Sequence, residues 1–128
     1  MSVLADTSVW IDYFRGTEPV ATELSRMLAD EPPAICGPIL AELVAGTPSA
    51  QREDVWLALA GLPFVELGRD EWTKAGEVAH ALRRSGARVP LLDILIAVAA
   101  VGAGAALWTR DSDFQRIREV LTGLRLYG

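Results

Sequence analysis

Cysteine, histidine and lysine are each represented once among the 128 residues, and each scarcity argues against a class of site. Cys36 has no second cysteine with which to form an internal disulfide, and its apolar neighbours indicate that it packs in the core. His80 has no further His or Cys at ligand spacing, which disfavours a zinc site and a His-based catalytic triad. Lys74 lies within an amphipathic helical pattern, whereas a phosphoacceptor receiver domain needs a lysine beside its acids.

Long apolar runs are also missing, although 51% of the residues are hydrophobic. A membrane span needs roughly 18 consecutive apolar residues, and glycines and Asp93 interrupt the longest run. The first ten residues are too short and too acidic for a secretory signal. We therefore expect one domain over residues 1–128, located in the cytoplasm and without contact with a membrane.

Positive charge is scarce in the first part of the chain. Residues 1–82 hold five Lys/Arg against thirteen Asp/Glu, whereas residues 83–128 hold seven Arg against four acids. The later arginines are expected to form a basic rim beside an acidic centre, although a solvated helix face is the simpler explanation for any one of them. They are Arg83, Arg84, Arg88, Arg110, Arg116, Arg118 and Arg125.

Short apolar segments alternate with helical patterns along the chain, which predicts an α/β fold with a mostly parallel sheet and right-handed crossovers. The expected strands are Val3–Ala5, Ala34–Cys36, Phe64–Leu67, Ala105–Thr109 and Leu124–Tyr127. The expected helices begin at a cap on Thr7 or Ser8, at Pro19, at Ile39, near residue 50, at a cap on Asp70, at Leu92 and near residue 113. Trp56 and Trp72 are both expected to face the core.

The stretch from Pro90 to Phe114 contains a predicted apolar helix and a predicted strand that together bring two distant acids to one edge of the domain. Leu92–Val101 is apolar on every side, so this helix is expected to be buried all round. It descends roughly 15 Å, and the strand at Ala105–Thr109 climbs back about 16 Å. Asp111 is therefore expected to return to the level of Asp93, on the same edge of the domain.

Four or five carboxylates are predicted to gather at that edge. Asp6 ends the first strand, Glu42 lies one helical turn beyond the loop after the second, and Asp93, Asp111 and Asp113 come from the stretch just described. The functional crevice of an open α/β sheet lies beyond the carboxyl ends of its strands. Since such acids repel one another, and since neither His nor Cys joins them, the pattern favours one or two Mg²⁺ or Mn²⁺ ions. Ions held in this way can activate a water for attack on a phosphodiester.

Four segments resemble, in chain order, the acidic motifs of the PIN-domain family. Their sequences are LADTSVW at residues 4–10, ILAEL at 39–43, LDILIA at 92–97 and LWTRDSDF at 107–114. Each motif alone is weak, but the four in order span nearly the whole chain. The resemblance is greatest to the small stand-alone VapC-type toxins.

That resemblance implies a PIN-like three-layer sandwich, with a mostly parallel central sheet of about five strands flanked by helices. It implies a Mg²⁺- or Mn²⁺-dependent endoribonuclease, the toxin of a toxin–antitoxin pair, that cleaves structured RNA such as tRNA or rRNA. A homodimer and a cognate VapB-like antitoxin are the implied partners. The metal-site residues carried over are Asp6, Glu42, Asp93 and Asp111, with Ser8 and Thr109 as polar supports.

The two acids of the last motif are assigned different roles. Ser112 and Gln115 have the spacing of a capping box, so Ser112 is expected to cap the final helix. Asp113 then favours the helix dipole and contributes mainly to stability, although a role as a metal ligand stays open. Asp111 has no comparable structural role and is expected to be the main ligand.

Other functions are weighed against this one. A phosphatase of the haloacid-dehalogenase type needs a second Asp where this chain has Ser8, and phosphate-cradling glycine motifs are absent. A PIN-like module that binds RNA or protein without cutting is the main alternative, although a pure binder has no need for mutually repelling acids. An apolar anchor for an inhibitory peptide is expected on the first helix, at Trp10 and Phe14.

Overall fold

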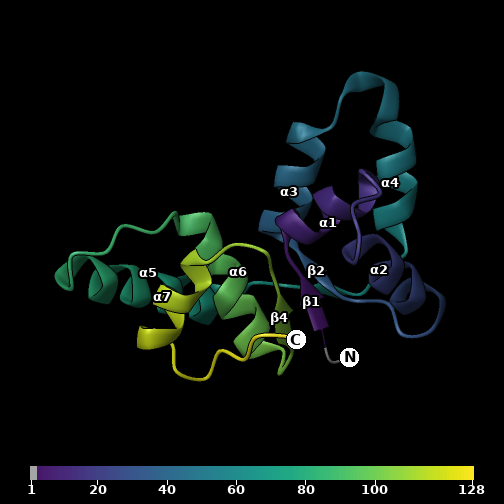
Figure 1. The fold of residues 1–128 in the computed structure, drawn as a ribbon. Coiled ribbons are helices and arrows are strands. Elements are labelled where there is room, and N and C mark those ends of the chain that lie inside the picture. Colours follow the sequence, from purple (N-terminus) through teal and green to yellow (C-terminus); the bar gives the residue numbers. More distant parts are fainter. Residues whose placement is uncertain (1–2) are drawn as a thin grey trace.

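The computed structural model describes residues 3–128, which fold around a small parallel sheet with helices on both faces (Figure 1). The strands are β1 (Val3–Ala5), β2 (Ile35–Cys36), β3 (Phe64–Val65) and β4 (Ala106–Trp108). The helices are α1 (Thr7–Phe14), α2 (Val20–Ala29), α3 (Gly37–Gly46), α4 (Arg52–Ala60), α5 (Arg69–Arg84), α6 (Leu91–Gly102) and α7 (Asp113–Val120), with a 3₁₀ turn at Ser49–Gln51 before α4.

The sheet has the order β3-β2-β1-β4, and every pairing is parallel. β1 pairs with β4 over three residues and β2 with β3 over two. A parallel bridge between Leu4 and Ala34 joins the two pairs. From the central β1 the chain first builds outward through β2 and β3, then crosses to the other side of β1 for β4. The ends of β1 and β4 therefore flank the point where the chain changes direction, which is where open α/β sheets bind ligands.

The fifth expected strand is reduced to a single bridge between Leu126 and Leu107. The amide of Leu107 donates to the carbonyl of Arg125, and the amide of Tyr127 donates to the carbonyl of Leu107, both at 2.8 Å. The segment thus lies beside β4 in a parallel arrangement. It is too short to qualify as a strand, so the sheet has four strands among the described residues, while the α/β class is confirmed.

Two helical arms extend from the sheet. Figure 1 shows α5, α6 and α7 packed together on one side and α1 to α4 on the other. α6 is the centre of the first arm, and its residues 94–100 are all buried. At its start, however, Leu92 is 42% exposed, so the expectation of a helix buried on every side is wrong for the first turn. No helix of residues 3–128 has the length and apolar character needed to cross a membrane.

The exposure of two tryptophans and the start of α5 differ from expectation. Trp56 is 48% exposed and Trp72 is 54% exposed, because the buried rows of α4 and α5 run through Val55 and Ala75 instead. α5 begins at Arg69 rather than behind a cap on Asp70. Its first turn is closed by Glu71, whose carboxylate accepts a hydrogen bond from the amide of Gly68 at 2.7 Å.

A candidate acidic metal centre

Asp6 directly follows β1 and is the one buried charged residue of the described chain, with 4% of its surface exposed. It also serves as the N-cap of α1, a role that the sequence had suggested for Thr7 or Ser8. Its Oδ1 atom accepts hydrogen bonds from the amides of Ser8 at 2.9 Å and Val9 at 3.4 Å. Capping satisfies two helix amides that would otherwise lack partners, and it places the acid at the positive end of the helix dipole.

Two hydroxyl groups complete the environment of Asp6. Ser8 Oγ donates to Oδ1 at 2.5 Å, and Thr109 Oγ1 donates to Oδ2 at 2.6 Å. The same two hydroxyls accept from the backbone after β4: Ser8 Oγ from the amide of Arg110 and Thr109 Oγ1 from the amide of Asp111, each at 3.0 Å. Burial raises the pKa of Asp6, and these hydrogen bonds oppose that rise.

Three further carboxylates meet beside this network, from Asp93 on α6, Asp111 after β4 and Asp113 at the start of α7. One oxygen of each lies within 4.8 Å of the others. Asp93 and Asp113 are half-buried, whereas Asp111 is exposed. The return of the chain from α6 through β4 brings Asp93 and Asp111 together, although they are 18 positions apart.

Ser112 is the N-cap of α7, as expected, although its side chain makes no capping hydrogen bond. The carboxylate of the preceding residue supplies one instead, because Asp111 Oδ1 accepts from the amide of Asp113 at 2.9 Å. The N-cap position is therefore confirmed and the capping box with Gln115 is wrong, and Asp111 has a structural role that the sequence does not predict. The carboxylate of Asp113 is left free of that role and points into the acidic cluster.

Glu42 lies on α3, outside the three-carboxylate cluster but close enough to act on it. Thr7 Oγ1 donates to Glu42 Oε1 at 2.7 Å, which fixes the glutamate beside α1. The pKa of Asp93 is raised to about 6, first by burial and then by the negative charges of Asp111, Glu42, Asp6 and Asp113. The sequence suggests Thr7 only as a possible helix cap and not as a residue of the site, although its position directly after Asp6 is a signal.

The donor atoms of this centre suit a hard divalent cation. Asp93, Asp111 and Asp113 supply carboxylate oxygens within mutual reach, and Asp6 and Glu42 adjoin them. The mutual repulsion that raises the pKa of Asp93 is the conflict that a cation removes. The thiol of Cys36 would be a softer ligand, but it is buried, and burial is the main cause that raises its pKa to about 11. The set therefore fits Mg²⁺ or Mn²⁺ better than zinc.

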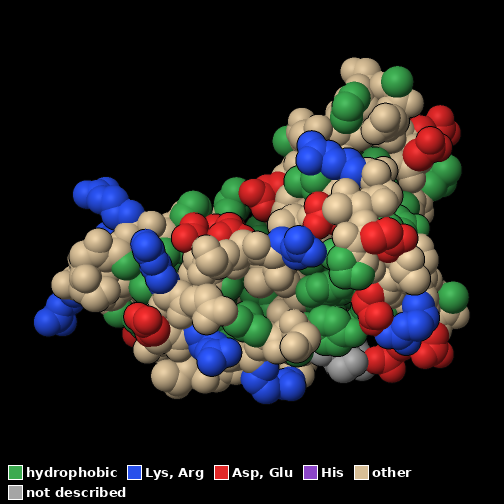
Figure 2. All heavy atoms as spheres, in the orientation of Figure 1, with side chains coloured by type: hydrophobic (Ala, Val, Ile, Leu, Met, Phe, Trp, Pro, Cys, Tyr) green, Lys and Arg blue, Asp and Glu red, His purple; other side chains and the backbone are tan. Residues whose placement is uncertain are grey.

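Acidic side chains are prominent on the surface around the centre. Figure 2 shows Asp and Glu side chains gathered in the concave junction between the two arms, and Lys and Arg side chains on both arms. Arg110 lies 3.8 Å from the carboxylate of Asp12. Positive charge is therefore not confined to a rim beside the acids.

The apolar anchor expected on α1 cannot include Trp10, whereas Phe14 stays a prediction. Trp10 is fully buried, and its indole Nε1 donates to the carbonyl of Ala5 at 3.1 Å, so it belongs to the core and offers no surface to a partner. Phe14 is 37% exposed and lines a groove of about 490 Å³ between α1, α3 and α4. Leu43 and Val55 form part of the groove wall, and Glu42 lies at its edge.

Comparison with known proteins gives one consistent result. The PIN domain family model matches residues 3–120. Ribonuclease VapC11 of Mycobacterium tuberculosis is 34% identical over 124 residues, covering 92% of both chains, and Ribonuclease VapC32 of the same species is 37% identical over 85% of this chain and 84% of its own. A DNA-bound VapBC structure from Salmonella typhimurium superposes with a TM-score of 0.77 at 19% identity, covering 99% of this chain and 97% of the other.

The raised pKa of Asp93 predicts how stability depends on pH in the absence of metal. Since the folded state holds this proton up to about pH 6 and the unfolded chain releases it near its ordinary value of 3.8, the free energy of unfolding falls as the pH rises through that window. In EDTA, Asp93→Asn should abolish this part of the decrease in the free energy of unfolding. The variant should therefore become more stable relative to the wild type as the pH rises from about 4 to 7. Thermal melts at stepped pH measure the difference. Asp54→Asn, an exposed acid on α4, is the control, and wild-type and Asp93→Asn curves that stay parallel would contradict the prediction.

Proposed function

The chain belongs to the PIN-domain family, within its VapC ribonuclease branch, and from that premise we propose that it is a metal-dependent endoribonuclease, the toxin of a VapBC-type pair. The observation that carries the proposal is the convergence of Asp93, Asp111 and Asp113 within 4.8 Å, next to the buried Asp6. Mg²⁺ or Mn²⁺ is the proposed ion.

The roles of the residues follow from their contacts. Asp93, Asp111 and Asp113 would hold the ion, which when bound lowers the pKa of a water and offsets charge on the scissile phosphate. Asp6 is locked by its hydrogen bonds to Ser8 and Thr109, so its negative charge keeps a fixed place at the floor of the centre. Such pre-orientation removes the reorganisation that a mobile carboxylate would require during phosphodiester hydrolysis.

Glu42 completes the centre from the opposite arm. Its carboxylate is oriented by Thr7 and faces the same junction as the other acids. In this position it can accept a hydrogen bond from the attacking water or add a ligand to the ion. A non-cleaving binding module remains the alternative function, and it has no use for a cluster whose acids raise one another's pKa.

The predicted substrate is structured RNA, such as tRNA or rRNA. The relatives are named ribonucleases, and the arginine-bearing arm beside the acidic centre supplies positive charge for a polyanion. The cationic surface would offset the repulsion between the acids and the RNA backbone.

Cleavage should require Asp93. Asp93→Asn keeps the size of the side chain but removes a ligand charge, so RNA cleavage should fall at least about 100-fold, and Mn²⁺ should no longer raise the melting temperature. For the wild type, free Mn²⁺ at one hundred times its Kd should add about 2.7 kcal/mol to the free energy of unfolding. Asp54→Asn should retain both properties. Cleavage that persists in EDTA, or at the wild-type rate in folded Asp93→Asn protein, would exclude the mechanism.

We propose that the groove between α1, α3 and α4 binds the VapB-like antitoxin. The groove is apolar at Phe14 and Leu43 and ends at Glu42, which suits an amphipathic segment that carries a basic residue toward the acids. Such a residue would neutralise the centre in place of a metal ion and exclude the substrate.

Phe14→Ala should therefore weaken antitoxin binding at least about tenfold, since truncation of a half-buried aromatic anchor costs more than 1 kcal/mol. Leu57→Ala is the matched control, because Leu57 is exposed on α4 and does not line the groove. Titration of each variant with the protein encoded beside it in the native operon gives the comparison. Equal affinities for the two variants would remove the groove from the interface.

We also propose a homodimer, with the second copy covering the apolar surface at β3 and the starts of α5 and α6. Phe64, Trp72 and Leu92 are exposed there around a hollow of about 330 Å³, an unusual density of large apolar side chains for a free surface. Pro38 and Leu95 line the same hollow, so the exposed residues are continuous with the core.

Trp72→Glu should convert the dimer to a monomer, because a buried unpaired charge opposes association. His80→Glu, on an exposed position of the same helix, should leave the dimer intact. Sedimentation equilibrium distinguishes the two masses. A wild type that is monomeric at all concentrations, or a Trp72→Glu variant that stays dimeric, would refute the assignment.

A further inference from the structure

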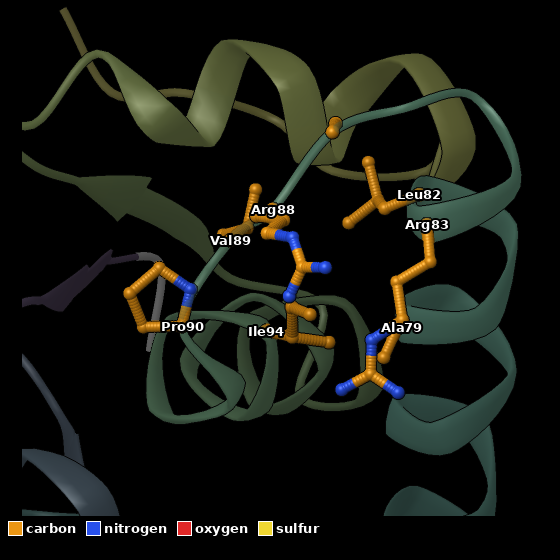
Figure 3. A pocket seen from close by; sticks show the side chains of 8 residues that line it. Ala79, Leu82, Arg83, Arg88, Val89, Pro90 and Ile94 are labelled. Carbon is orange, nitrogen blue, oxygen red and sulfur yellow. The ribbon is translucent and has the colours of Figure 1, made fainter.

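A second hollow, of about 290 Å³, lies where the end of α5 meets the start of α6, and two arginines border it (Figure 3). Figure 3 shows the side chains of Arg83, from α5, and Arg88, from the connecting segment, on two sides of this space; in the view the guanidinium group of Arg88 lies above Ile94 and that of Arg83 lies lower, by Ala79. The remaining wall is apolar and includes Leu82 and Val89. The hollow thus combines two cations with a hydrophobic floor.

The connection between the two helices builds this arrangement. α5 ends at Arg84, and Gly86 adopts a φ of +85°, a left-handed conformation that lets the chain reverse. The amide of Ala87 then donates to the carbonyl of Leu82 at 2.9 Å, which fixes the returning segment against the last turn of α5. The reversal brings Arg88 alongside Arg83.

Neither guanidinium is neutralised by a carboxylate of the described residues. The ion pairs formed among residues 3–128 involve Arg26 and Arg110, and no hydrogen bond joins Arg83 or Arg88 to a carboxylate. Leu82 and Ile94, which line the same hollow, are buried, so its floor is part of the hydrophobic core. Two free arginine forks over an apolar floor match a ligand that has a phosphate at one end and a flat, weakly polar body at the other.

The hollow and the acidic centre share the first turn of α6. Pro90 lines the hollow, and its carbonyl accepts hydrogen bonds from the amides of Asp93 at 3.1 Å and Ile94 at 3.3 Å. Asp93 belongs to the acidic centre and Ile94, the next residue, forms the floor of the hollow. One helical turn spans roughly 5 Å, so a chain with its phosphate at the acids can reach the hollow within a short segment.

We propose that this hollow is a nucleotide subsite for the RNA strand, in which Arg83 and Arg88 clamp a phosphate next to the cleaved one and the apolar floor receives the attached ribose or base. The proposal rests on the ribonuclease function proposed above and deepens it by assigning a place to the substrate strand. Recognition of the phosphate and of the face of the base is independent of sequence, so the subsite would position the strand without selecting it.

The test compares two charge-matched double variants. Arg83→Gln/Arg88→Gln removes the clamp, whereas Arg84→Gln/Arg118→Gln removes two exposed arginines that do not line the hollow. Each is combined with Asp93→Asn to prevent cleavage, and binding of a short labelled single-stranded RNA of random sequence is titrated at several salt concentrations. The clamp variant should bind on the order of 100-fold more weakly than the control pair. Its salt slope should fall by about 0.7 for each phosphate that the two arginines neutralise.

A third variant and a modified RNA sharpen the result. Arg83→Lys/Arg88→Lys keeps the charge but loses the bidentate forks, and it should recover only part of the affinity. Replacing single phosphates of the RNA with neutral methylphosphonates should reveal one linkage whose loss weakens the parent protein but not the clamp variant.

The outcomes separate this inference from the proposed function. If RNA is cleaved by the wild type but the clamp and control pairs bind it equally, the subsite is wrong and the ribonuclease function stands. If the clamp pair loses affinity for the antitoxin and retains affinity for RNA, the hollow is a protein contact and the inference is likewise overturned. If the wild type neither binds nor cleaves RNA in Mn²⁺, the proposed ribonuclease function and the subsite are both wrong.

Discussion

The hydrogen bonds that hold the buried carboxylate of Asp6 are the constraint on which the rest of the centre depends. A carboxylate with 4% of its surface exposed is costly unless its oxygens are paired. Both oxygens are paired here, through the first turn of α1 and through Thr109 after β4. The same bonds tie the ends of the two strands together, since Ser8 and Thr109 also accept from the backbone beyond β4. A single buried acid therefore fixes the loop that carries Asp111 and, through it, the start of α7.

The acids arranged by this network oppose the stability of the fold that carries them. Asp93 is half-buried beside several negative charges, and its raised pKa records that cost. The core compensates elsewhere: residues 94–100 of α6 are buried without interruption, and β1 and β4 pair directly against the helix layer. A structure optimised for stability alone would place a neutral residue at position 93. An acid at this position fits the ligand role proposed above, because a bound cation would neutralise its charge.

The sequence predicted the elements that follow from periodicity and chain length. The prediction that Asp93 and Asp111 lie close together rested on a helix and a strand of similar expected length. The cluster of carboxylates confirms that the two residues are close. Which of several neighbouring polar residues caps a helix was harder to predict. Asp6, Thr7 and Ser8 are all good capping residues in succession, and only the backbone of β1 decides that Asp6 takes the position. At α7, Ser112 takes the N-cap position as predicted, but the side chain that accepts a hydrogen bond from the first helical amide is that of Asp111.

Burial of the aromatic residues could not be read from pattern alone, because it depends on which surfaces the folded chain has left to cover. Trp10 and Trp72 both occupy apolar positions of amphipathic helices, yet one is fully buried and the other is 54% exposed. Trp10 lies at the centre of the sheet and the α1 layer, where its indole finds the carbonyl of Ala5. Trp72 lies in the first turn of α5 and lines a hollow with residues of α3 and α6, which leave more than half of its surface uncovered. An amphipathic pattern identifies the apolar face of a helix, which is stabilised by packing against another surface. Tertiary structure decides whether that surface belongs to the same chain or to a second one.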